Sequence, residues 1–281
     1  MIRPNEIVID ESNYLDHINP IVDGTPVSRG LVQRNFNTHP VGYLGEFCPA
    51  METVNIPLIP RGEWSDRIKE MEAKKSRLSD LRLIGNKGNP IPSLDQNGKG
   101  YCWAHSTTTA VMLTRAIMGE PYVPLSAYAV ACMEKNFRDE GGWGAESLEF
   151  MSNRGIPSSE FWPMQSMSRS NDNPNTWANA AQHKVTSGWV DLSAAVYDRK
   201  LTWDQVATLL LSRVPVVGDF WWWGHSVCLL DLVELEPGSF GVRILNSWGD
   251  RWSDRGMGIL KGSQAIPDCA VAPRIVTPSL N

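Results

Sequence analysis

The sequence has helical patterning in its earlier part and strand patterning in its later part, and this division limits the folds that the chain can adopt. From about residue 185 onward, short runs rich in β-branched and aromatic residues are separated by Gly, Pro and Asp turns. These runs are VTSGWVDL, VPVVGDFWWW, HSVCLLDLVEL, GVRILNSW and GMGILKG, interrupted by one helical pattern, LTWDQVATLLLSR. The order of the two parts predicts an α+β protein with a helical lobe followed by a β-rich lobe.

The helical part begins with an amphipathic segment. Residues 63–82 place apolar residues at helical spacing with charges between them: Trp64, Ile68, Met71, Leu78 and Leu81. This pattern predicts one helix, whose simplest role is packing. A turn-rich loop, LIGNKGNPIPSLDQNGKGY, then leads to a helix that begins near Cys102.

Residues 1 to about 60 contain many turn formers and little periodicity, which predicts an irregular N-terminal arm. Its apolar residues are too scattered to form a core of their own: Ile7, Val8, Ile9, Tyr14, Leu15, Leu31, Phe36, Tyr43, Leu44 and Phe47. Because covering apolar surface lowers the free energy, we expect contacts to order the arm. It could lie on the protein's own lobes, including a cleft between them, or attach the protein to a larger assembly.

Composition excludes several classes of function. Hydrophobic residues make up 42% of the 281, and the formal net charge is −5 with no basic stripe, so we expect a globular protein without a nucleic-acid partner. No signal peptide or membrane-spanning run is visible. Five scattered cysteines do not form a disulfide framework. We therefore expect no membrane partner, no intrachain disulfide, and a cytoplasmic or other reducing compartment.

The stretch QNGKGYCWAHS places a single cysteine, Cys102, where a loop becomes a helix. Unpaired backbone N–H groups and a partial positive charge at a helix N-terminus favour an anion. A thiol there is biased toward thiolate, the nucleophilic form, so we expect a depressed pKa for Cys102. Gln96, six residues earlier, could donate its amide to an oxyanion beside the Cys102 N–H.

A nucleophilic thiol needs a base, and the base needs an orienting partner. His225 begins the run HSVCLL, and Asn246 follows the next strand pattern in NSWGDRW. Asn246 could accept a hydrogen bond from one nitrogen of the imidazole, while Trp248 shields that bond from water.

The blocks QNGKGYCWAHS, GHSVCLL and NSWGDRW resemble the signature blocks of the papain-like cysteine proteases, in the family's order. His225 lies 123 residues and Asn246 lies 144 residues after Cys102, near the family's spacing. The resemblance covers about residues 88–281. It implies a two-lobed papain-like fold, with a helical lobe over about 88–184 and a β-barrel-like lobe over about 185–281. Residues 61–281 would form the peptidase domain, and residues 1–60 an arm or pro-segment.

The resemblance also implies an activity and a substrate site. The protein would hydrolyse peptide bonds in peptide or protein substrates, with Cys102 attacking, His225 moving the proton, Asn246 orienting His225 and Gln96 in the oxyanion hole. Gly141 and Gly142 would pair with substrate backbone, and Trp143 would wall the pocket for the second residue before the cut. The full substrate-binding set is Gly100, Gly141, Gly142, Trp143, Gly224 and Trp248. No cofactor or metal is implied.

The sequence departs from the family pattern at several positions. Lys99 stands where secreted members carry a bridging cysteine, and Cys132 and Cys269 have no obvious mates. Tyr101 replaces a small residue before the nucleophile, and His105 replaces an aromatic residue after it. The arm lacks the long paired helices of a typical inhibitory propeptide, so that activation mechanism does not follow from the resemblance.

Two alternative hypotheses place the protein in other functional classes, namely a scaffold and a metal-binding protein. The atypical arm, Tyr101 and His105 are compatible with a papain-like scaffold that docks onto an assembly and has weak or blocked activity. Alternatively, Cys102 with His105 and His225 with Cys228 could supply four zinc ligands. Residues three apart on a strand point to opposite faces, which counts against His225 and Cys228 as joint ligands. The zinc hypothesis also leaves Gln96 and Asn246 unexplained.

Overall fold

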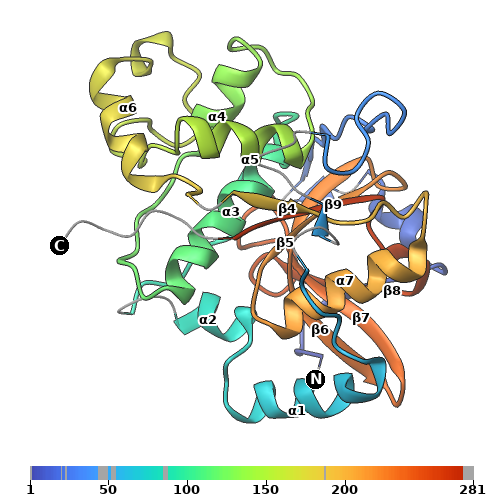
Figure 1. The fold of residues 1–281 in the computed structure, drawn as a ribbon. Helices are drawn as coiled ribbons and strands as arrows, with labels where there is room; N and C mark the ends of the chain where they lie inside the picture. The colour runs from blue at the N-terminus through green and yellow to red at the C-terminus, as the bar shows by residue number, and fades with distance from the viewer. Residues whose placement is uncertain are drawn as a thin grey trace.

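The long helix α3 (Cys102–Ile117) lies at the centre of the computed structural model, between smaller helices and the face of a sheet (Figure 1). The structure describes residues 2–19, 21–22, 24–43, 50–51, 55–84, 88–186 and 188–274. Every residue of α3 from Cys102 to Arg115 is buried, because the helix packs against other helices on one side and strands on the other. Among the described residues, no helix is long and apolar enough to cross a bilayer.

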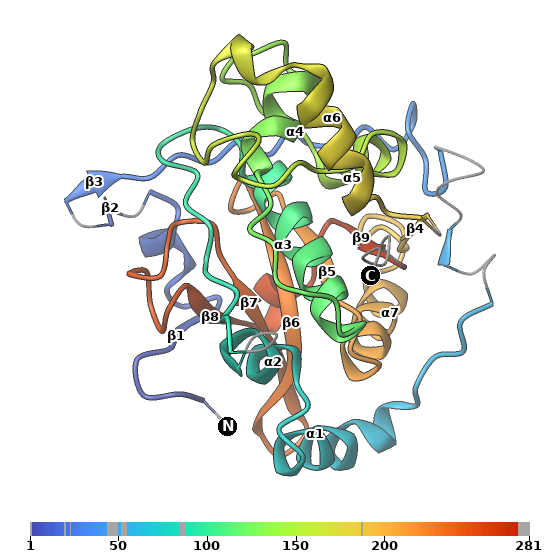
Figure 2. The same cartoon turned by 90° about the vertical axis from the view of Figure 1, so that its left-hand side faces the viewer.

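The helical lobe gathers around one end of α3. It contains α4 (Ala127–Glu134), α5 (Gly144–Asn153) and α6 (Pro174–Ala180), which lie together in Figures 1 and 2. The start of α6 follows from its sequence. The Asn173 side chain accepts hydrogen bonds from the next turn, and Pro174 occupies the first helical position, where no N–H is needed.

The β-rich lobe is built on a seven-stranded sheet with the order β1-β8-β7-β6-β5-β9-β4. All pairs are antiparallel except β1 with β8. The strands from the C-terminal half are β4 (Trp189–Asp191), β5 (Val216–Phe220), β6 (His225–Glu236), β7 (Ser239–Leu245), β8 (Met257–Lys261) and β9 (Cys269–Pro273). Each of the five predicted runs contains a strand. The predicted helix at 201–213 is α7 (Arg199–Leu211), capped by the Asp198 side chain.

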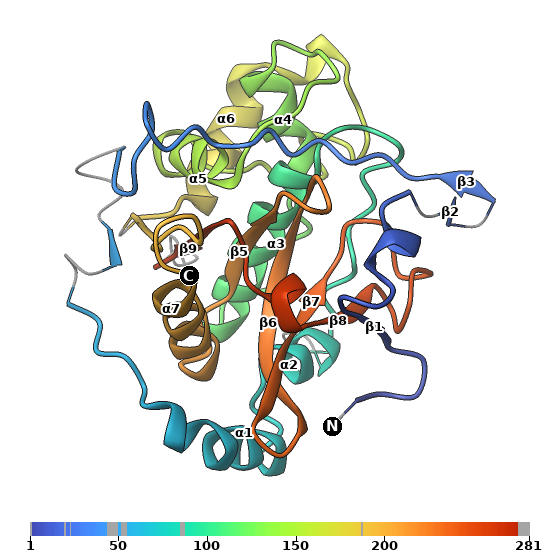
Figure 3. The same cartoon turned by 90° about the vertical axis from the view of Figure 1, so that its right-hand side faces the viewer.

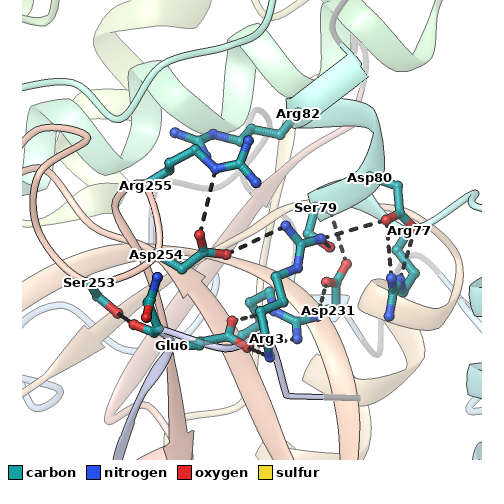
Figure 4. A network of polar contacts seen from close by, with 12 residues as sticks. Arg3, Glu6, Arg77, Ser79, Asp80, Arg82, Asp231, Ser253, Asp254 and Arg255 are labelled. Carbon is teal, nitrogen blue, oxygen red and sulfur yellow. Dashed lines mark hydrogen bonds and ion pairs between the residues drawn. The ribbon is translucent and has the colours of Figure 1, made fainter.

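The first strand of the sheet comes from the N-terminal arm. β1 (Ile7–Ile9) adds to the edge of the sheet beside β8, and Ile9 is fully buried. Glu6, next to this strand, forms a bidentate ion pair with Arg243, which also pairs with Asp231. Glu6 and Asp231 belong to the network of polar contacts in Figure 4. The expected irregular arm therefore contains a strand, and its three residues are too few to show an alternating pattern in the sequence.

The predicted single helix over 63–82 is wrong in one respect, because the segment forms two helices. α1 (Trp64–Ala73) ends where Lys75 adopts a left-handed conformation with φ of 51°. The N–H of Ser76 then bonds to Met71 O and that of Lys75 to Glu72 O, which is the Schellman arrangement. A second helix, α2 (Leu78–Ile84), follows. Lysine at a position that favours glycine gave no sequence signal for this break.

The remainder of the described arm lies on the protein's own lobes. A short hairpin pairs β2 (Ile21–Val22) with β3 (Thr25–Pro26). From this hairpin, residues 24–43 run across the molecule between α4 and α5 on one side and the sheet on the other (Figure 3). We call residues 24–43 the strap. Within the arm, Phe36 is buried, whereas Leu15 and Tyr43 are exposed. The predicted contacts of Leu44 and Phe47 lie outside the described residues.

Candidate active site

Cys102 is the first residue of α3, as the loop-to-helix junction predicts, and its side chain is fully buried. The groups around its sulfur are backbone N–H groups of Ser226 on β6, Trp103 on α3 and Gly30 of the strap. The thiol therefore lies where the helical lobe, the sheet and the strap meet.

His225 begins β6 and is also fully buried. Its Nε2 donates to Asn246 Oδ1 at 2.7 Å, so the structure brings together the predicted base and its predicted orienting partner. The Trp248 ring stacks on the imidazole with a centroid separation of 4.7 Å, and Trp223 contacts it edge-on at 5.0 Å. The other ring nitrogen, Nδ1, is buried without a hydrogen-bond partner among the described residues.

Three groups hold the side-chain amide of Gln96, namely the Ser247 hydroxyl, the Ser28 carbonyl and the Lys99 carbonyl. Its Oε1 accepts a hydrogen bond from the Ser247 hydroxyl at 2.6 Å, which directs Nε2 the other way. Nε2 donates to the carbonyl of Ser28, in the strap, at 2.9 Å. Sequence reasoning did not identify Ser247, because a serine after Asn246 carries no signal of its own.

The strap fills the cleft along the residues predicted for substrate binding. Gly142 N–H donates to Gly30 O, and Val32 N–H donates to Gly142 O, both at 2.9 Å, in a parallel bridge. From the opposite wall, Gly224 O accepts the Leu31 N–H at 3.2 Å. Backbone pairing of this kind leaves no room for a second extended chain at Gly142.

The other predicted substrate-binding residues also meet the strap. Trp248 Nε1 donates to Ser28 O, and Trp143 lies under the guanidinium of Arg34. Gly30 approaches Gly100 so closely that an added Cβ would lie 2.0 Å from the Gly100 carbonyl oxygen. A Cβ on Gly141 would lie 2.5 Å from Gly30 O. The strap therefore depends on glycine at its point of closest approach.

Burial under the strap controls the protonation of both candidate catalytic groups. Burial raises the pKa of the Cys102 thiol to about 12, although nearby backbone N–H groups favour the thiolate. Burial lowers the pKa of His225 to about 3, and the hydrogen bond to Asn246 opposes that shift. The expected depression of the Cys102 pKa is therefore wrong for this covered state, because desolvation outweighs the helix N-terminus.

The residues that depart from the family pattern have structural roles in the helical lobe. The Tyr101 hydroxyl donates to Arg138 O, and its ring packs edge-on against Tyr128. His105 bonds through Nδ1 to Tyr101 O and also packs against Tyr128.

The structure also bears on the cysteines and on the hypothesis of a zinc site. Lys99 forms an ion pair with Asp139. Cys102, Cys132, Cys228 and Cys269 are free thiols, and Cys48 lies outside the described residues. Within the described ranges, no group of three or more His, Cys, Asp or Glu side chains is arranged to hold a metal ion.

Comparison with known proteins bears on the fold and the family. A family model for the papain family cysteine proteases matches residues 79–217. Zingipain-1 from Zingiber officinale is 34% identical over 79 residues, 27% of this chain and 36% of its own length. A cathepsin L-like proteinase from Phaedon cochleariae is 23% identical over 223 residues, 69% of this chain and 68% of its own.

Solved structures share the fold at lower identity. Procathepsin L 3 of Tenebrio molitor has a TM-score of 0.54 and 15% identity, covering 76% of this chain and 88% of its own. Bromelain of Ananas comosus, solved with the E64 inhibitor, has a TM-score of 0.55 and 18% identity, covering 71% and 97%. The family match and the shared two-lobed α+β fold show that this chain belongs to the papain family of cysteine proteases.

Proposed function

We propose that the protein hydrolyses peptide bonds through a triad of Cys102, His225 and Asn246, with Gln96 and the Cys102 N–H as the oxyanion hole. The observation that carries this proposal is the state of His225. One ring nitrogen is held by Asn246, and the other is buried without a hydrogen-bond partner in the part of the chain that the structure describes. The backbone N–H of the next residue, Ser226, faces the Cys102 sulfur. A neutral imidazole with its proton on Nε2 has a free electron pair on Nδ1, as a base requires.

The reaction follows from these placements. The Cys102 thiol transfers its proton to His225 Nδ1, and the sulfur attacks the carbonyl carbon of the peptide bond. Gln96 Nε2 and the Cys102 N–H donate to the oxyanion, and Asn246 holds the imidazolium. His225 then protonates the departing amine. Water, deprotonated by His225, attacks the thioester, which releases the acid and restores the thiol.

Access to this site depends on the strap. Cys102 and His225 are fully buried, and Ser28 O occupies the hydrogen bond of Gln96 that an oxyanion would use. We propose that the full chain is covered in its resting state and hydrolyses peptides only when the strap leaves the cleft. The alternative of a scaffold with a blocked site draws on the same burial, so the test must uncover the cleft.

The test uses the close approach at Gly30. A methyl group at this position meets the Gly100 backbone, which cannot easily move, so Gly30→Ala should push the strap out of the cleft. We expect an irreversible thiol-directed peptide epoxide to add once to Cys102 in Gly30→Ala, faster than in the unaltered chain, and peptide hydrolysis to increase. Intact-protein mass and peptide mapping locate the adduct.

The matched control is Gly62→Ala, because a Cβ there meets nothing within 4 Å. It should label at the rate of the unaltered chain. Adding His225→Ala to Gly30→Ala should prevent labelling. If Gly30→Ala remains folded, gains accessibility to a small thiol reagent and still neither labels with the epoxide nor cleaves peptides, the blocked scaffold is the correct reading.

A further inference from the structure

Arg34 of the strap places a guanidinium in a buried acidic pocket beside the cleft. The residue is 5% exposed, and its Nη1 and Nη2 donate to the two oxygens of Asp191 at 3.0 and 2.8 Å. Its guanidinium carbon lies 4.8 Å from the centre of the Trp143 ring. Bidentate pairing with a carboxylate and stacking on an aromatic ring are the two contacts that distinguish arginine from other side chains.

This pocket continues from the edge that pairs with extended backbone. Val32 bonds to Gly142, the residue before Trp143, and Arg34 follows two positions later in the strap. The carboxylate comes from the last residue of β4, at the edge of the sheet. An extended chain held on Gly142 can therefore reach the pocket with a side chain.

A second acid lies in the same region. Asp219 on β5 is 2% exposed, and its Oδ2 accepts a long hydrogen bond of 3.4 Å from Gly144 N–H, next to Trp143. Its Oδ1 is buried without a hydrogen-bond partner among the described residues. Asp219 pairs across the sheet with Cys269, whose sulfur lies 3.5 Å from Arg34 Nη1. Burial raises the pKa of Asp219 to about 7; hydrogen bonds from the Ser226 side chain and the Gly144 N–H oppose that rise, and the charge of Arg34 opposes it less.

Arg34 also holds the strap together, since it donates to the carbonyls of His39 and Pro40. Those bonds explain why the strap carries an arginine. They do not explain the pocket, because Asp191, Asp219 and Trp143 belong to the two lobes. When the strap leaves, Asp191 loses the guanidinium of Arg34, and removing one partner of a buried ion pair is costly. A cation of the same shape is the ligand that restores the pairing.

We propose that Trp143, Asp191 and Asp219 form a recognition pocket for an arginine side chain of the substrate, and that Arg34 occupies it as an internal substitute. As a specificity site, this proposal rests on the proposed peptidase function. Lysine should bind less well, because its ammonium cannot pair with both oxygens of Asp191 in one plane.

The first experiment tests recognition without catalysis. In full-length Arg34→Ala, ethylguanidinium should raise the melting temperature in a saturable way, whereas ethylurea, its uncharged analogue of similar shape, should not. The unaltered chain should not respond to either, because its pocket is filled, and Arg34→Ala with Asp191→Asn should lose the response. Arg34→Met keeps the aliphatic stem and replaces Arg34→Ala if the latter does not fold. If ethylurea raises the melting temperature equally, or if ethylguanidinium does not raise it, the proposed recognition pocket is refuted.

The second experiment measures specificity in full-length Gly30→Ala. Matched peptides carry arginine or norleucine at each of the four positions before the cut. At one position, kcat/KM should favour arginine by about 10- to 100-fold, the usual scale for one charge-assisted bidentate contact. Asp191→Asn and Asp219→Asn should each reduce this ratio, whereas Asp66→Asn, an exposed carboxylate on α1, should not.

The two experiments distinguish failure of the proposed peptidase function from failure of the proposed recognition pocket. If no peptide is cleaved, the proposed function fails, and the guanidinium response still decides whether the pocket exists. If peptides are cleaved without preference for arginine at any position, the recognition pocket is refuted and the peptidase function stands.

Discussion

At the scale of single residues, the site combines four side chains whose contributions to catalysis should differ in size. In the proposed mechanism, Gln96 donates to an oxyanion, His225 moves protons, and Asn246 acts only through His225. In the uncovered Gly30→Ala chain, Gln96→Ala should lower kcat by about 10²- to 10³-fold, the usual effect of losing one oxyanion donor. Asn246→Ala should lower kcat less than His225→Ala, because it removes orientation and not the base. Steady-state kinetics on one peptide ranks the three variants.

Cys102→Ala is the reference for this series, since it removes the nucleophile. Circular dichroism should show the same fold in all four variants. Hydrolysis that survives Cys102→Ala would refute the mechanism.

We expect His105 to make the unfolding free energy of the protein depend on pH. Burial lowers the pKa of His105 to about 4, so it stays neutral when folded, whereas in the unfolded chain it takes up a proton near pH 6.5. Its stabilising effect is therefore complete above pH 6.5 and is lost as the pH falls toward 4. When the pH falls from 7 to 5, the unfolding free energy should decrease in both proteins. The decrease should be roughly 2 kcal/mol larger in the unaltered chain than in His105→Gln.

Urea unfolding at the two pH values measures this difference. His39→Gln, at a half-buried residue of the strap, is the control. An equal loss in His105→Gln and the unaltered chain would show that His105 is not the group that titrates.

At the scale of elements, the sequence predicted what periodicity and turn residues encode. The strands of the C-terminal half and α7 were predicted because each is long enough to show its pattern between Gly, Pro and Asp turns. Two features of the fold were not predicted, because their short local sequences carry no pattern that reveals them. β1 has three residues and gains its order from β8, and the break after α1 depends on Lys75 adopting a conformation that lysine does not signal.

The anchoring of β1 gives a prediction for stability. Glu6 and Arg243 are both buried, and Glu6→Gln removes one carboxylate from a guanidinium that also pairs with Asp231. Loss of one partner of a buried pair should cost roughly 3 kcal/mol of unfolding free energy. Glu63→Gln, which removes an exposed i,i+4 partner of Arg67, should cost less than about 1 kcal/mol. Denaturant unfolding of both variants compares them, and equal costs would show that β1 is not held through Glu6.

At the scale of the whole molecule, the candidate site was predictable and its covering was not. Gln96, Cys102, His225 and Asn246 stand in local contexts that carry chemistry, so their order and spacing were readable from the sequence. The path of the arm depends on contacts between distant segments, such as Gly30 with Gly100 and Arg34 with Asp191. Composition predicted only that the arm would lie on some surface. Attachment of the arm to a larger assembly stays a prediction.

The arm has two parts, and we expect them to behave differently when the site is uncovered. β1 belongs to the sheet, whereas the strap lies in the cleft, so the arm cannot leave as one unit without removing an edge strand. We expect cuts at two engineered sites for a specific protease, one at the exposed hairpin residue Gly24 and one at exposed Asn55, to release the strap and raise activity. The N-terminal fragment should stay bound through β8 and Arg243.

Native mass spectrometry of the doubly cut protein counts the fragments that remain, and gel filtration followed by a peptide assay measures the activity. A protein cut only at Asn55 is the control, since its strap remains tethered through β1. Adding Glu6→Gln to the doubly cut protein should release the N-terminal fragment as well, because the buried ion pair holds it. If the N-terminal fragment leaves with the strap in the unaltered background, the whole arm is one removable segment, and β1 is not an integral strand of the active peptidase.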